Sequence, residues 1–162
     1  HGTENEVLIE RMQRWVKTLL MTSNARDLPH TIADHIQHDF MVPQVAIKVW
    51  GVREDFKIEP FAQSVIDPIK DFAASLTTPY VGINNNFDAV QWLADPAAAQ
   101  SVAFIALRAT RPEDTPQTAA EQPVIGLLVL ASPDPQRYYE GMGTTIIERM
   151  GDLASAALSH LR

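Results

Sequence analysis

The sequence predicts an α+β domain in which short strands alternate with helices. Three observations lead to this fold class. Apolar residues recur every three or four positions near both ends of the chain, which is the period of an amphipathic helix. In residues 44–50 they alternate, which is the period of a strand. A length of 162 residues, with 46% hydrophobic and 20% charged residues, fits one domain with a sizeable core.

A helix is predicted over residues 6–22. Its apolar positions lie four, three and four residues apart and form a heptad-like seam: Leu8, Met12, Trp15 and Leu19. Charged residues occupy the flanking positions, as expected for an amphipathic helix with one buried side.

The beginning of the chain indicates how the domain is bounded. The sequence starts with His1-Gly2-Thr3 and has no initial methionine. Residues 1–5 are therefore interpreted as a cloning remnant or linker, and residues 6–162 as a single domain. Because the helical pattern starts almost at once, we expect the first helix to continue an upstream helical segment that this sequence lacks.

A second helix is predicted from Asp27 to the region of Pro43. Asp27 is a favourable N-cap residue, Pro29 fits the first turn, and Pro43 cannot continue a helix. The apolar residues of this segment share one face: Leu28, Ile32, Ile36 and Phe40.

The central part of the chain predicts strands and short helices. Residues 44–50 and 55–59 both alternate and are interpreted as a hairpin whose second strand is exposed on one face. A short helix is predicted from Asp67 to Leu76 and a brief strand from Tyr80 to Ile83. One or two helical turns follow at residues 88–93.

The two clearest strands are residues 101–109 and 124–131, because both are almost entirely apolar and therefore suit central positions in the sheet. Residues 111–122 contain prolines and no periodicity, which predicts an exposed loop. A final helix begins after Gly143, where Thr144 is expected to cap it. Its apolar stripe consists of Ile146, Met150, Leu153, Ala157 and Leu161.

One stretch near the C-terminus resembles a known family. Residues 126–144, GLLVLASPDPQRYYEGMGT, and the Pro79-x-x-Gly82 segment are similar to the bacterial family catalogued as domain of unknown function number 484, and the order of elements resembles the GAF fold. The resemblance implies an antiparallel sheet of five or six strands in the order 2-1-5-4-3, with the first and last helices on one face. Short helices would then cover a small-molecule pocket on the other face.

Composition excludes several classes of function. Thirteen Lys and Arg against twenty Asp and Glu give a net charge of −7, which repels nucleic acids and anionic membrane surfaces. The absence of cysteine excludes thiol nucleophiles, cysteine-bound metals and covalently attached bilins. The longest apolar run, residues 124–131, is far shorter than the roughly 20 residues of a membrane-spanning helix. A cytoplasmic location without membrane or nucleic-acid partners is predicted.

No residue is predicted to be catalytic or to bind a metal. His30, Asp34 and His38 share one face of the second helix, but the two histidines are roughly 12 Å apart along its axis, so they are interpreted as a solvent face. The chain contains no Gly-x-Ser-x-Gly motif, and the turn at residues 141–144 lacks the lysine of a phosphate-binding loop.

The resemblance places several aromatic and polar residues around the expected pocket. These candidate ligand-binding residues are Phe72, Tyr80, Asn84, Asn86, Phe87, Trp92, Phe104 and Arg108. Packing in the core is the alternative role for each aromatic residue, and Arg108 could simply reach solvent. The identity of the ligand is unknown.

The terminal helices are expected to form a homodimer, because each carries a broad apolar stripe. The predicted interface residues are Leu8, Met12, Trp15, Leu19, Ile146, Met150 and Leu153. The leading hypothesis is therefore a non-enzymatic, dimeric GAF-type domain that senses a small molecule or regulates a partner. The alternative is a ligand-free scaffold for protein interaction or dimerisation.

Overall fold

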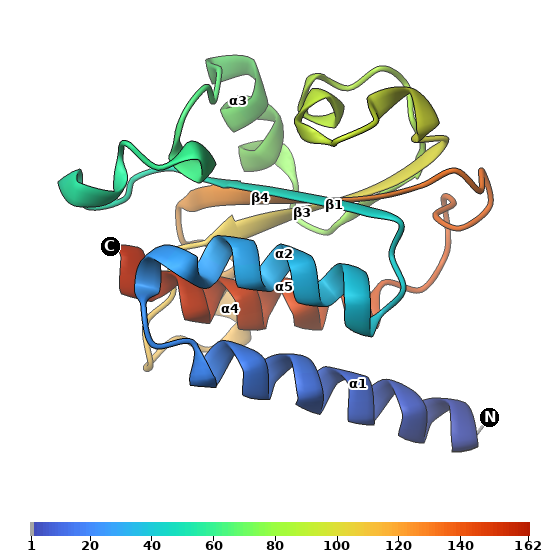
Figure 1. Ribbon diagram of the computed structural model, residues 1–162, viewed down its shortest axis with the longest axis horizontal. Helices are drawn as coiled ribbons and strands as arrows, with labels where there is room; N and C mark the ends of the chain where they lie inside the picture. Colours follow the sequence, from blue (N-terminus) through green and yellow to red (C-terminus); the bar gives the residue numbers. More distant parts are fainter. Residues whose placement is uncertain (1) are drawn as a thin grey trace.

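The computed structural model describes residues 2–162 and shows four layers (Figure 1). Short helical segments cover one face of a central sheet, helices α2 (Leu28–Asp39) and α5 (Thr145–Leu158) cover the other, and α1 (Gly2–Met21) lies beneath α2 and α5. Two apolar clusters, one on each side of the sheet, hold these layers together. The α+β class predicted from the periodicities is confirmed.

The sheet is antiparallel and contains four strands within residues 2–162. They are β1 (Gln44–Val49), β2 (Tyr80–Ile83), β3 (Ser101–Arg108) and β4 (Val124–Ser132). Their order across the sheet is β1-β4-β3-β2. The two most apolar segments, β3 and β4, are the central strands and are buried on both faces, as their composition predicts.

The predicted strand at residues 55–59 is wrong. Residues Glu54–Phe56 form a turn of 3-10 helix, and Ile58 is 75% exposed. Phe56 alone enters the core, and the guanidinium groups of Arg26 and Arg53 lie over its ring. Because one buried aromatic residue holds this segment, its alternation does not require a pairing partner. The prediction of five or six strands in the order 2-1-5-4-3 is therefore not confirmed.

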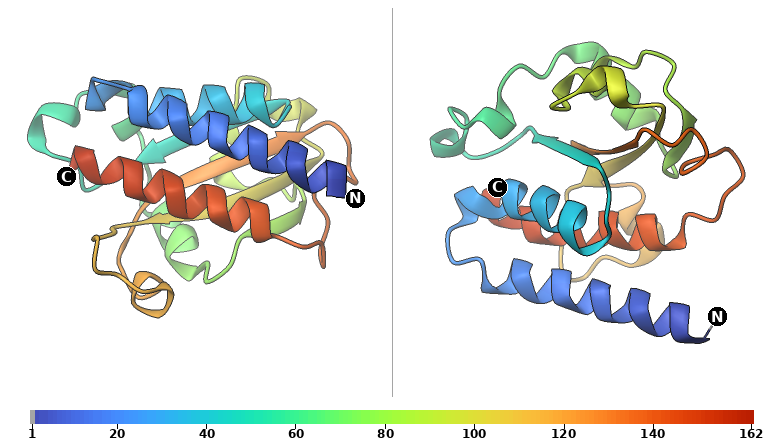
Figure 2. Two further views of the ribbon diagram at one scale, coloured as in Figure 1. Left: turned by 90° about the horizontal axis from the view of Figure 1, so that it is seen from below. Right: turned by 45° about the vertical axis from the view of Figure 1, so that its right-hand side comes forward.

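Helix α1 is held to the rest of the chain by Trp15. The indole N–H donates a hydrogen bond to the Ile32 carbonyl of α2 at 3.3 Å, and the ring packs edge to face against Phe40 at 6.5 Å. Figure 2 shows α1 crossing the outer surface of α2 and α5. No helix among residues 2–162 is long and apolar enough to cross a membrane.

Three local predictions differ in detail from the structure. Asp27 precedes α2, but its side chain does not cap the helix. The Thr144 hydroxyl donates to Glu148 at 2.7 Å and does not accept a bond from the first turn of α5. The predicted loop at residues 111–122 contains a short helix, α4 (Pro116–Ala119), which a capping box at Thr115 starts.

Candidate functional site

Four of the predicted ligand-binding aromatics pack against one another on the sheet face opposite α5. Phe104 lies at the centre of this aromatic cluster, with its ring centroid 5.2 Å from that of Phe72 and 5.0 Å from that of Phe87. Tyr80 lies 5.0 Å from Phe87, and its hydroxyl donates to the Ile83 carbonyl. These near-perpendicular contacts are favourable for aromatic pairs. The four side chains therefore form core in the region where the resemblance implied a pocket.

Three other predicted ligand-binding residues make contacts with neighbouring parts of the chain. The Asn84 side chain donates to the Ala99 carbonyl at 3.0 Å and accepts from the Asn86 backbone N–H at 3.1 Å. Both asparagines therefore shape the turn after β2. Trp92 is half-buried, with the ammonium group of Lys48 5.9 Å from its ring centroid.

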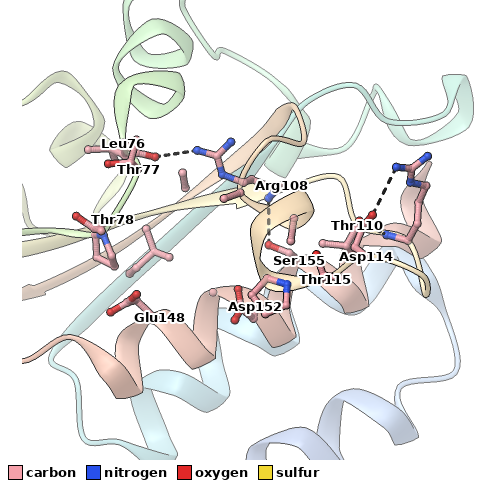
Figure 3. A pocket seen from close by; sticks show the side chains of 18 residues that line it. Leu76, Thr77, Thr78, Arg108, Thr110, Asp114, Thr115, Glu148, Asp152 and Ser155 are labelled. Carbon is pink, nitrogen blue, oxygen red and sulfur yellow. Dashed lines mark hydrogen bonds and ion pairs between the residues drawn. The ribbon is translucent and has the colours of Figure 1, made fainter.

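A polar groove of about 460 Å³ opens instead at the end of β3 (Figure 3). One wall is the segment 76–79 that leads into β2, another is α5, and a third is the loop after β3 with α4. We call this cavity the polar groove. Of the residues predicted to bind a ligand, Arg108 alone lines it.

The strand pairing explains why the groove exists. β2 starts at Tyr80, which pairs with Phe104, and Pro79 comes directly before it. Because proline has no N–H to donate, the chain separates from β3 at this point. The β3 edge from residue 105 to 108 is consequently left without a neighbouring strand on this side, and the Arg108 N–H donates to the Ser155 hydroxyl of α5 at 3.1 Å.

Arg108 holds two sides of the groove together. Its guanidinium group donates to the carbonyl of Gln122 at 2.8 Å and to the carbonyl of Leu76 at 2.9 Å. Among residues 2–162, no carboxylate forms an ion pair with it. Its positive charge is therefore half-buried beside the groove without a balancing negative charge in contact.

The α5 wall of the groove is acidic. Glu148 and Asp152 lie one helical turn apart and both line the cavity. Partial burial raises the pKa of Asp152, the negative charge of Glu148 raises it further, and Arg149 opposes both effects. Gly151 lies between them, where a Cβ atom would come within 2.6 Å of Ile105. The absence of a side chain at residue 151 thus lets α5 lie close against β3.

The raised pKa of Asp152 predicts how stability depends on pH. The folded state holds this proton more tightly than the unfolded state, so the group reduces stability as pH rises from its ordinary pKa through the raised value. Asp152→Asn should therefore raise the midpoint of urea unfolding at pH 7 and have no such effect at about pH 3, where both states are protonated. The gain should shrink in a Glu148→Gln background. An equal rise of the urea midpoint at both pH values would show that the raised pKa of Asp152 is not the cause of the added stability.

The lining of the polar groove is rich in hydrogen-bonding side chains. Hydroxyl groups line it together with charges of both signs: Thr77, Thr78, Thr110, Thr115, Ser155, Arg108, Arg111, Asp114, Glu148 and Asp152. Such donors and acceptors orient a small ligand through hydrogen bonds. Within the described part of the chain, no three His, Asp or Glu residues are grouped so that they could hold a metal ion. His30 and Asp34 contact each other at 2.8 Å on the exposed face of α2.

A second, apolar groove of about 510 Å³ lies between the C-terminal halves of α1 and α5. Val16, Leu19 and Leu20 form one side, and Leu153 and Ala157 are part of the other. We call this cavity the apolar groove. It lies on the outer surface of the two terminal helices, where the sequence predicts an interface.

Four of the seven predicted dimer residues are buried in the interior of the chain itself. Met12, Trp15, Leu19 and Met150 are buried in the single chain, whereas Leu8, Ile146 and Leu153 are half-buried. Heptad spacing predicts a helix seam but does not specify whether the seam meets the same chain or a second copy. The exposed apolar residues of α1 are Val7, Ile9, Leu20 and Met21.

Comparisons with known proteins agree with this architecture. The family model described as "Protein of unknown function, DUF484" matches residues 1–160. The GAF domain of an Acinetobacter phosphoenolpyruvate-protein phosphotransferase is 11% identical, with a TM-score of 0.57 over 99% of this chain and 95% of that one. A far-red cyanobacteriochrome photoreceptor is 13% identical, with a TM-score of 0.53 over 99% and 98%. A comparison with curated proteins finds no match. The similarity to these solved structures establishes the GAF fold.

Proposed function

Because the chain belongs to the DUF484 family and has the GAF fold, we propose that it is a non-enzymatic regulatory domain that binds a polar small molecule and acts as a homodimer. The polar groove is the proposed binding site. The observation that carries this proposal is the half-buried guanidinium of Arg108, which lines a cavity of about 460 Å³ without an ion-pair partner among residues 2–162.

The chemistry of the groove favours a ligand with both donor and acceptor groups. The remaining N–H groups of Arg108 suit an oxygen acceptor, and the carboxylates of Glu148 and Asp152 suit a donor. The exposed edge of β3 and the threonine hydroxyls add weaker hydrogen-bonding positions. An amphoteric small molecule would satisfy more of these groups than an apolar one.

The position of α5 links the groove to assembly. One side of this helix forms the acidic wall of the polar groove, and another side borders the apolar groove beside α1. A ligand that binds two positions of α5 unequally would shift the population between them, and the shift would reach any partner bound to α1 and α5.

The filled aromatic cluster favours a second candidate function. Phe72, Tyr80, Phe87 and Phe104 occupy the side of the sheet where the resemblance implied a ligand. A domain without a ligand there would serve as a dimerisation or protein-interaction scaffold. The two candidates differ in whether a small molecule occupies the polar groove.

Blocking the groove tests the binding proposal. Thr78→Trp introduces a large side chain into the groove wall, whereas Ala74→Trp places the same side chain at an exposed position of helix α3 (Asp67–Ser75) outside it. After gentle purification, denaturation should release a small molecule from the wild type and from Ala74→Trp, detected by mass spectrometry. We expect Thr78→Trp to release at least about tenfold less, the loss caused by roughly 1.4 kcal/mol of binding energy.

Two outcomes would count against binding in the polar groove. Release of the same molecule in equal amount by Thr78→Trp would place the ligand elsewhere. Absence of any released molecule from the wild type would support the scaffold. Circular dichroism and the unfolding midpoint of both tryptophan variants serve as controls for folding.

A further inference from the structure

A second heptad stripe lies beside the buried seam of α1 and faces solvent. Ile9, Gln13, Val16 and Leu20 follow one another at spacings of four, three and four residues. Ile9 is 55% exposed and Leu20 is 81% exposed, whereas Val16 is half-buried at the apolar groove. This stripe, which we call the outer stripe, contains two of the four exposed apolar residues of α1, Ile9 and Leu20.

The apolar groove extends the outer stripe onto α5. Val16 and Leu20 contribute to both, and Leu153 and Ala157 of α5 lie across the groove from them. Figure 2 shows α1 and α5 running side by side with their lengths exposed in the view from below. A helix laid along the outer stripe would therefore contact both terminal helices.

The charges on α1 are segregated along its length. Its acidic residues, Glu4, Glu6 and Glu10, lie in the first half, and its basic residues, Arg11, Arg14 and Lys17, follow them. Glu10 and Lys17 are exposed, lie seven residues apart and flank the outer stripe on the same side. Such flanking charges select the orientation of packed helices more than they add affinity.

From this pattern we infer that the outer stripe binds α1 of a second copy in the antiparallel orientation. This inference rests on the proposed homodimer and specifies its interface. Ile9 would pack against Leu20 of the partner subunit, and Gln13 against the partner's Val16. Glu10 would then lie beside the partner's Lys17, and the two-fold axis would repeat this ion pair.

A parallel dimer would not use these charges. In parallel helices, the residues that flank a heptad stripe on one side face the opposite flank of the partner. That opposite flank contains Met12 and Leu19, which are buried within the chain. Glu10 and Lys17 would therefore have no oppositely charged partner. Charge pairing across the outer stripe thus favours the antiparallel arrangement.

Charge exchange on the full chain tests the orientation. Sedimentation equilibrium should show that Glu10→Lys and Lys17→Glu each weaken dimerisation about tenfold, because each converts two attractive contacts into two repulsive ones. The double variant exchanges both charges and should recover the wild-type dissociation constant. Glu54→Lys and Lys57→Glu make the same changes of charge at an ion pair outside α1 and should leave dimerisation unchanged.

Disulfide formation gives an independent measurement, because the chain has no cysteine. Under mild oxidation, the double variant Ile9→Cys/Leu20→Cys should form a covalent dimer, whereas Ile9→Cys alone should not. A covalent dimer from Ile9→Cys alone, or equal dissociation constants for all the charge variants, would overturn the antiparallel arrangement while leaving the homodimer intact. A wild type that remains monomeric at high concentration would instead overturn the proposed homodimer.

Discussion

Replacing Trp15 with alanine should reduce the free energy of unfolding by about 3–5 kcal/mol, the cost typical of removing a large aromatic side chain from a core. Trp15 is 0% exposed, donates to the Ile32 carbonyl and packs against Phe40. The variant would lose this packing and leave the carbonyl with one bond fewer. Urea denaturation followed by circular dichroism measures the change.

The same denaturation experiment distinguishes a seam that packs within the chain from a seam that packs against a second copy. If Trp15 packs within the chain, the loss of stability should be the same at every protein concentration. Gln91→Ala, at an exposed position outside α1, should change stability by less than about 0.5 kcal/mol. A loss for Trp15→Ala that grows on dilution would show that the indole lies between subunits and would contradict its intramolecular placement.

Phe104→Ala should also cost about 3–5 kcal/mol, because it empties the centre of the aromatic cluster. Phe104 is 0% exposed on a central strand, and three aromatic rings lie within 5.9 Å of its centroid. Phe87→Ala, at the half-buried edge of the cluster, should cost less. Denaturation of both variants with urea compares the two positions.

The outcome at Phe104 decides whether the cluster is core or pocket. A large loss of stability with the small molecule still released from the protein would fit a packed core and a separate polar groove. A variant that folds with nearly unchanged stability and releases no small molecule would contradict that assignment and return the ligand to the aromatic face.

Periodicity predicted the helices and the central strands because burial imposes it directly. Strands β3 and β4 are apolar throughout because both of their faces are covered. The same reasoning failed at residues 55–59, where alternation was taken as a strand. The buried Phe56 side chain and the arginines over its ring hold that segment as a turn. Alternation over five residues does not reveal whether a second strand is present to pair with it.

The candidate site was only partly predictable for a different reason. The polar groove forms where Pro79 ends the pairing of β2, so that three segments far apart in the sequence meet around an open strand edge. None of these segments carries a catalytic or ligand-binding motif. Arg108 was identified because the family resemblance placed it beside the expected pocket, but Asp152 and Ser155 look like ordinary polar positions on the last helix.

The proposed interface on α1 shows a limit of heptad patterns. Two stripes run side by side on this helix, one through Trp15 and one through Val16. The first is longer and more apolar, and the chain buries it in its own core. The second includes Gln13 and becomes a candidate interface only after the first has been assigned to the core, because exposure rather than spacing distinguishes the two stripes.

A native mass spectrum of the gently purified protein tests the proposed regulatory dimer most directly, because one measurement reports both stoichiometry and retained ligand. The expected species has twice the 18.0 kDa mass of the chain plus a discrete additional mass. That additional mass should be missing from Thr78→Trp and present in Ala74→Trp. A bare dimer would support the scaffold in place of the sensor. A bare monomer at micromolar concentration would contradict both the ligand and the homodimer.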